Sequence, residues 1–203
     1  MNTIYFYEFV NRLERVLSAA YEAKYSLGAL ERQISYCTYF QKIEEGAGFE
    51  LVTIENKLMK EIFPEITINL DNVPVHNQCL WVAESYLHIQ ENTGLTFEAI
   101  FLYIPIEMMY QYFSIYHEMD FSQIVDEFIK LFKKKSVLSA LSKKYGLSMR
   151  EVAKATNISY ETLLSLKQRK RDISKANYEM VYKISKFFHV RASTLAELNN
   201  NNY

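Results

Sequence analysis

Residues 146–171 read GLSMREVAKATNISYETLLSLKQRKR, and this stretch decides the fold of the C-terminal part of the chain. Ser148 and Glu151 have the spacing of a capping box, in which two side chains satisfy the first backbone N–H groups of a helix. Asn157 follows where the helix has to end, and Asn adopts the left-handed conformation of such an end more readily than most residues. The pattern predicts a short helix over residues 149–156.

A second short helix is predicted directly after this one. Ser159 is a good N-cap residue, and Leu163 and Leu166 are spaced to share one buried face. The basic loop 169–171 then breaks the pattern. The two helices, the second over residues 159–167, are therefore expected to be joined by a tight turn.

Apolar residues at helical spacing predict three further helices around this pair. The first helix ends at Gly146, a residue suited to the position after a helix. The residues of the three stripes are Leu138, Leu141 and Tyr145 before the pair, Val181, Ile184 and Phe188 after it, and Val190 with Leu195 at the last helix.

Charge divides the chain in the same place. Residues 1–132 contain eight Lys and Arg against nineteen Asp and Glu, whereas residues 133–203 contain fifteen against five. The net charges are therefore −11 and +10, although the whole chain carries only −1. Such an asymmetry indicates an anion-binding module attached to a different domain. We expect an acidic domain over 1–132 and a basic domain over 133–203.

Residues 138–195 resemble a helix-turn-helix domain of the Xre-type, phage-repressor/Cro-like family. The residues that carry the resemblance are Gly146-Leu147-Ser148, Glu151-Val152-Ala153, Asn157-Ile158-Ser159, Leu163, Leu166, Lys170-Arg171, Val181, Ile184, Phe188, Val190 and Leu195. The resemblance implies a five-helix, lambda-repressor-like domain that binds double-stranded DNA. Residues 159–167 would be the recognition helix in the major groove, and residues 149–156 the supporting helix.

The resemblance also implies which side chains meet the DNA. Base edges would be approached by Tyr160, Glu161, Thr162 and Ser165. Phosphates would be contacted by Ser159, Lys143, Arg150, Lys154, Lys167, Arg169, Lys170 and Arg171. Four positions depart from the family pattern: Met149 stands in place of Gln, Lys167 in place of Glu, Arg169 in place of Gly and Ser142 in place of Arg. These departures put individual phosphate contacts in doubt, but not the binding mode.

Residues 1–132 are expected to be helical as well. Only five Gly and three Pro occur in the chain, which favours helices over strands and turns. Helices are predicted over 3–24, 27–44, 77–90, 96–103, 105–117 and from Asp120 to the domain boundary. The pattern of residues 51–63 is ambiguous, although it could be helical. Residues 66–70 alternate between apolar and polar side chains, which is typical of a short strand. The fold class is therefore mainly α, with a helical N-terminal domain.

No catalytic or metal-binding constellation emerges from the sequence. His117-Glu118 lacks the second His of a zinc-binding HExxH motif, and His76, Cys79 and His88 have no ligand spacing. We therefore expect no enzymatic activity, no metal and no cofactor. Two lone cysteines, no signal peptide and no apolar span long enough for a membrane lead us to expect a cytoplasmic protein without a membrane partner.

Two functions from different classes remain open. In the first, the chain is a sequence-specific transcriptional regulator, a homodimeric repressor of a palindromic operator, whose N-terminal domain dimerises or senses a small effector. In the alternative, the N-terminal domain captures a protein partner, as an antitoxin or anti-repressor does, and DNA binding autoregulates. An enzyme with a DNA-binding tail is disfavoured because no catalytic site is found.

Overall fold

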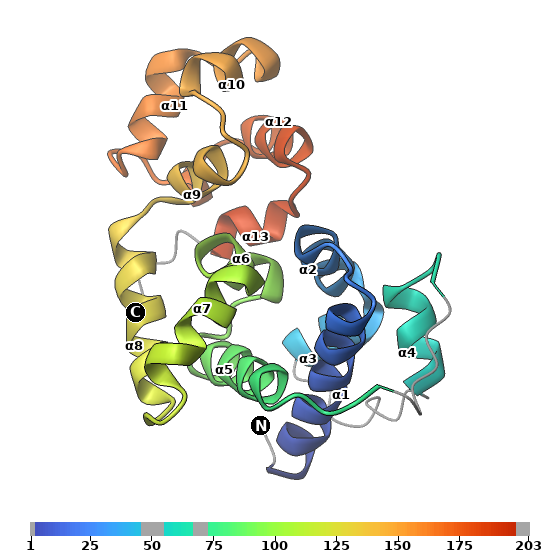
Figure 1. Cartoon of the computed structure of the whole chain (residues 1–203). Helices are drawn as coiled ribbons and strands as arrows, with labels where there is room; N and C mark the ends of the chain where they lie inside the picture. The colour runs from blue at the N-terminus through green and yellow to red at the C-terminus, as the bar shows by residue number, and fades with distance from the viewer. Residues whose placement is uncertain (1–2, 46–54, 67–72, 198–203) are drawn as a thin grey trace. The chain divides into compact units, whose positions relative to one another are not determined.

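The computed structural model describes residues 3–45, 55–66 and 73–197, and all regular secondary structure in these ranges is helical (Figure 1). The expected mainly α fold is confirmed. The chain separates into two compact units, residues 1–126 and 127–203. The division lies within a helix, α8 (Ser122–Lys134), earlier in that helix than the boundary predicted from charge.

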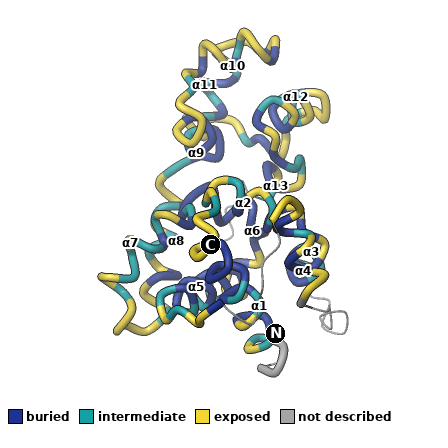
Figure 2. The backbone as a smooth tube through the Cα atoms, turned by 45° about the vertical axis from the view of Figure 1, so that its right-hand side comes forward, coloured by how far each residue is buried: buried dark blue, intermediate teal, exposed yellow. Residues whose placement is uncertain are grey.

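Within residues 3–45, 55–66 and 73–121, the N-terminal unit contains seven α-helices before α8. They are α1 (Thr3–Glu22), α2 (Leu27–Tyr36), α3 (Thr38–Glu44), α4 (Glu55–Ile62), α5 (Asn77–Thr93), α6 (Phe97–Tyr103) and α7 (Ile106–Tyr116). Helix α5 is buried over most of its length and packs along α1, with α6 and α7 also against it (Figure 2). A helix buried on nearly every side forms the centre of a domain.

The start of α7 is stabilised by a carboxylate from a distant helix. Pro105 is the N-cap residue and supplies no side-chain hydrogen bond, so the first N–H groups of α7 need another acceptor. The Ile106 N–H donates to Oε1 of Glu31, 75 residues earlier in the chain, at 2.9 Å. Glu31 is buried, and its negative charge lies at the positive end of the helix dipole. This contact ties α2 to α7.

Two other helices of the N-terminal unit begin in the same way. The Phe97 N–H of α6 donates to Glu44 Oε1 at 2.6 Å, in addition to the local cap by Thr96. The Thr38 N–H of α3 donates to Glu61 Oε1, also at 2.6 Å. Part of the acidity of this unit therefore serves helix starts that lie far from the carboxylates in sequence.

The predicted helices of the N-terminal unit are largely present, with one clear correction. The single helix predicted over 27–44 is two helices, because Cys37 is extended (φ −66°, ψ 127°) and separates α2 from α3. Pro105 stands at the N-cap of α7, one position before the expected first turn. Asp120 accepts from the Ser122 N–H at 2.8 Å, as expected for a cap before α8. The strand predicted over 66–70 lies almost wholly outside the described residues.

The C-terminal unit holds α9 (Val137–Lys144), α10 (Met149–Thr156), α11 (Tyr160–Lys167), the 3-10 turn η3 (Ile173–Lys175), α12 (Tyr178–Phe188) and α13 (Ala192–Glu197). The five α-helices, α9 to α13, follow the predicted order. Their buried apolar residues include Leu138, Leu141, Val152, Leu163, Ile184, Phe188 and Leu195. Three residues expected on buried faces are less covered: Ala153 and Val181 are half-buried, and Tyr145 is exposed while its ring contacts Phe188.

Candidate nucleic-acid interface

The turn between α10 and α11 is built by local hydrogen bonds. Both bonds of the predicted capping box are present: Ser148 N–H donates to Glu151 Oε2 at 2.7 Å, and Glu151 N–H donates to Ser148 Oγ at 3.3 Å. These bonds from Ser148 lower the pKa of the Glu151 carboxyl. Asn157 ends α10 in the left-handed conformation with φ 53°. The direction of α11 relative to α10 therefore follows from a few residues next to each other in the chain.

Helix α11 presents its first turn to solvent and its other side to the core. Leu163 and Leu166 are buried, whereas Tyr160 and Glu161 are exposed. Thr162 and Ser165, expected to be exposed, are half-buried. Of the four side chains predicted to approach bases, the structure therefore places two fully at the surface.

The Ser159 hydroxyl makes hydrogen bonds to Thr162, at the start of α11. Its Oγ accepts from the Thr162 N–H at 3.2 Å and donates to Thr162 Oγ1 at 2.8 Å. The hydroxyl proton thus already has an acceptor, so a phosphate at this helix start would meet the backbone N–H groups of α11 before it meets the Ser159 side chain.

A shallow hollow of about 470 Å³ lies between α9, the start of α10 and one side of α11 along its length. Its lining comprises Ser139, Ser148, Met149, Arg150, Tyr160, Leu164, Lys167 and Gln168. At its rim the Arg150 guanidinium lies over the Tyr160 ring, 5.8 Å from the centroid. Such a cation–π contact restrains both side chains at an otherwise mobile surface.

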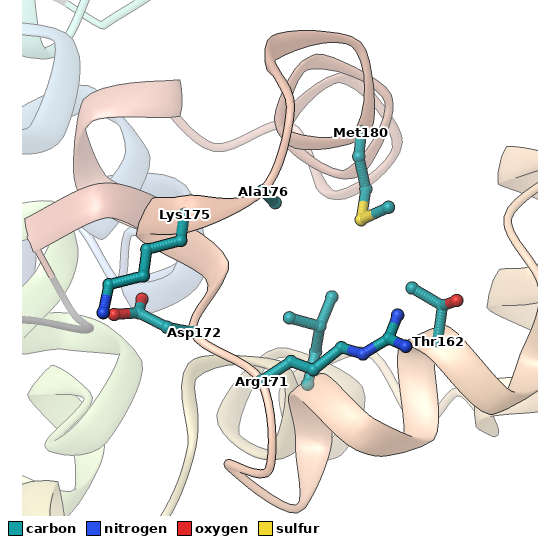
Figure 3. Close-up of a pocket in the computed structure, with 7 residues that line it drawn as sticks. Thr162, Arg171, Asp172, Lys175, Ala176 and Met180 are labelled. Carbon is teal, nitrogen blue, oxygen red and sulfur yellow. The ribbon is translucent and has the colours of Figure 1, made fainter.

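A second hollow, of about 270 Å³, lies on the other side of α11 (Figure 3). It is lined by Thr162, Leu166, Arg171, Asp172, Lys175, Ala176 and Met180. In Figure 3 the Arg171 guanidinium points toward Thr162, and the Lys175 side chain lies beside Asp172. Lys175, at the end of the 3-10 turn η3, is a further exposed cation that the sequence pattern did not single out.

Most of the cations predicted to contact phosphates are free to reach a ligand at the surface. Lys143, Arg150, Lys154, Lys170 and Arg171 are exposed, and Lys167 is half-buried. They come from α9, α10, α11 and the loop after α11, so the unit carries positive charge on several elements around the α10–α11 pair. Positive charge in this arrangement suits a polyanion with regularly spaced phosphates.

Arg169 differs from the other predicted cations, because its guanidinium is engaged within the protein. Nη1 donates to the Lys133 carbonyl at 2.6 Å, and Nη2 donates to the Phe132 and Lys135 carbonyls, each at 2.5 Å. The carbonyls in the last turn of a helix have no N–H to accept from within that helix. Arg169 therefore closes the end of α8, and three of the five N–H groups of its guanidinium are used within the protein.

Comparison with models of known protein families, with curated proteins and with solved structures gives no significant match. In the part of the chain that the structure describes, no three His, Cys, Asp or Glu side chains come together as a metal site, and His76, Cys79 and His88 do not converge. Across the same ranges, none of the helices combines the length and apolar character needed to span a bilayer.

Proposed function

We propose that the C-terminal unit binds double-stranded DNA with α11 in the major groove, as in Xre-type repressors, and that the chain is a sequence-specific transcriptional regulator. The observation that carries the proposal is the α10–α11 pair: two short helices joined through Asn157 in the left-handed conformation, with Tyr160 and Glu161 exposed at the start of the second. The second helix of such a pair is the one that reads the major groove.

The surrounding charge supports a nucleic acid as the ligand. Exposed Lys143, Arg150, Lys154, Lys170 and Arg171 surround the pair, and Lys175 adds a cation beside the second hollow. In protein–DNA complexes, phosphate contacts fix the register of the protein, and base contacts supply the specificity. We assign these cations to phosphates and the first turn of α11 to base edges.

Tyr160 and Glu161 are the two strongest candidates for base contacts. The Tyr160 ring can cover a thymine methyl group, and Glu161 can accept from cytosine N4. Arg150 restrains the Tyr160 ring, so this side chain is partly ordered before DNA arrives. Thr162 and Ser165 are half-buried, so they would contact bases only where α11 lies deep in the major groove.

A single module of this size reads few base pairs, so we infer that the chain acts as a homodimer on a palindromic operator, as a repressor in the cytoplasm. Two-fold pairing places half-sites about one helical turn apart. The N-terminal unit would supply dimerisation or effector sensing. The second candidate is capture of a protein partner by this unit, which exposes the apolar side chains Val75, Ile115 and Met119.

The first test is selection from a random duplex pool with the full-length protein at about 150 mM salt, where nonspecific binding is already weakened. The expected result is enrichment of a palindromic sequence. A folded protein that enriches no sequence would contradict the regulator proposal and direct the search to a protein partner.

Variants separate the two kinds of contact. Lys170→Ala should weaken binding to all sequences and lower the slope of log K against log salt by about one. Tyr160→Ala should instead change which sequences are preferred, with the slope kept. Lys183→Ala is the matched control, because Lys183 lies on α12 and pairs with Glu179 at 2.6 Å. If the Lys170 and Tyr160 variants behaved alike, the proposed orientation of α11 would be wrong.

A further inference from the structure

Arg169 lies at the end of α11 but holds the end of α8. Its guanidinium donates three hydrogen bonds, to the carbonyls of Phe132, Lys133 and Lys135. Two of these acceptors belong to the last turn of α8, and the third follows it directly. One side chain therefore joins the C-terminal ends of two helices that are more than 30 residues apart in the chain.

The backbone at Arg169 has a conformation that usually favours Gly. Arg169 N–H donates to the Leu166 carbonyl, and Lys170 N–H donates to the Ser165 carbonyl, the two bonds of a Schellman motif. The first residue after such a helix end is left-handed and usually Gly, as at Gly146 after α9 with φ 64°. Arg169 has φ 57° at the same position. Arg169 therefore carries a conformational cost that Gly would avoid at this position.

The side chain of Ser136 adds a fourth hydrogen bond at the junction between the end of α8 and the end of α11. The buried hydroxyl of Ser136 donates to the Lys167 carbonyl at 2.7 Å, at the last residue of α11. The same Oγ accepts from the Ser139 N–H at 3.2 Å and so caps α9. The end of α8, the start of α9 and the end of α11 are thus held together by the side chains of Ser136 and Arg169.

We propose that Arg169 is a positioning residue for DNA recognition: it fixes the direction of α11 against α8 and α9, and does not contact phosphate. This inference rests on the proposed function. Its consequence is that sequence-specific binding depends on Arg169 more than nonspecific binding does, because only base contacts need α11 in one orientation.

The test compares Arg169→Gly, Arg169→Lys and Lys170→Ala by measuring affinity for the selected operator and for unrelated duplex over a range of salt. Gly removes the guanidinium and adopts the left-handed backbone conformation without strain. The Arg169→Gly variant is therefore expected to fold. For Arg169→Gly we expect operator affinity to fall by roughly tenfold, with nonspecific affinity and salt slope nearly unchanged, whereas Lys170→Ala lowers both affinities and reduces the slope by about one.

Arg169→Lys keeps the charge but replaces the planar fork that reaches three carbonyls. We expect operator affinity to stay reduced in this variant. Full recovery by Lys, or a slope lowered by one in Arg169→Gly, would show that Arg169 acts as a phosphate contact and would overturn the proposal.

Amide hydrogen exchange without DNA tests the junction separately from the proposed function. In Arg169→Gly the Lys135 N–H, which donates to the Leu131 carbonyl at 3.1 Å, should exchange faster, as should amides in the last turn of α11. Unchanged exchange would overturn the positioning role even if DNA binds. If the wild-type protein bound no DNA while exchange responded as expected, the proposed function would fail and the junction would stand.

Discussion

Local side-chain caps occur in both units, as at Ser26 before α2 and Thr96 before α6, but three helices of the N-terminal unit also receive a carboxylate from a distant part of the chain. In the C-terminal unit the acceptor is a side chain two or three residues from its donor: Ser136, Ser148, Ser159, Asp172 and Asn177 each cap the element that follows. In the N-terminal unit α3, α6 and α7 receive carboxylates from 23, 53 and 75 residues away. Local caps form with the helix, whereas distant caps form only after the helices have packed.

This difference matters most at α7, where Glu31 and the hydrogen bond it accepts from the Ile106 N–H are buried. A local cap contributes about 1 kcal/mol. A buried carboxylate that satisfies a distant N–H contributes more, because its loss leaves a buried donor without an acceptor. The predictions below test whether the two units respond separately and by these different amounts.

The largest effect is expected for the two thiols, which lie only in the N-terminal unit. Cys37 and Cys79 are buried and free, and burial raises the pKa of the Cys37 thiol to about 12. Burial also raises the pKa of Cys79, whose Sγ lies 3.3 Å from the Tyr110 hydroxyl. Labelling of Cys37 by a thiol reagent at pH 8 should be about a thousandfold slower than in the urea-unfolded chain, since only the thiolate reacts, and labelling of Cys79 should also be slowed.

Thiol labelling therefore reports opening of the N-terminal unit alone. Substitutions in α10 should leave the labelling rate unchanged, while those at distant caps should increase it. Rapid labelling of the folded wild-type protein would contradict the tight packing around α2, α3 and α5.

Glu31→Ala should destabilise the N-terminal unit by about 3 kcal/mol, because the Ile106 N–H loses a charged acceptor inside the core. Urea unfolding followed by the fluorescence of Trp81, the only tryptophan, measures this unit selectively. The exposed Glu65→Ala is the matched control and should have little effect. A decrease of less than about 1 kcal/mol in the free energy of unfolding would mean that Glu31 contributes no more than a local cap does.

Ser148→Ala should cost about 1 kcal/mol, because it removes the capping box of α10. Amide exchange of α10 in native conditions measures the loss. Lys154→Ala, an exposed substitution on the same helix, keeps the caps and serves as the control. The urea concentration at the midpoint of the Trp81 fluorescence transition should stay unchanged. A shift of this midpoint would show that the two units unfold as one.

The smallest effect concerns His88, whose ring stacks on Phe121 with centroids 4.5 Å apart. Burial lowers the pKa of His88 in the folded state, so the unfolded chain binds the proton more readily. The N-terminal unit should lose stability as the pH falls below about 6.5 toward the folded pKa. His88→Phe should reduce this pH dependence, and an NMR titration of His88 measures the pKa directly. A His88 pKa at or above the ordinary value would contradict the burial argument.

Local patterns explain why the C-terminal unit was predicted more fully than the N-terminal one. Ser148, Glu151 and Asn157 lie within ten residues of one another, and the interactions they make are encoded at that range. The break at Cys37 could not be predicted, since the acceptor that stabilises the start of α3 is Glu61, on another helix. Within the candidate interface, the exposed Tyr160 and the cations followed from periodicity and charge, but the role of Arg169 did not.

The sequence alone determined the helical fold class, the change in charge along the chain and the α10–α11 pair, because helical periodicity, caps and charge depend on neighbours in the chain. The tertiary structure decided which carboxylate serves which helix start, and that Arg169 holds the end of α8. These contacts join residues between 23 and 75 positions apart in the chain. No local pattern specifies them, since many side chains of the same type compete for each backbone group until packing selects one.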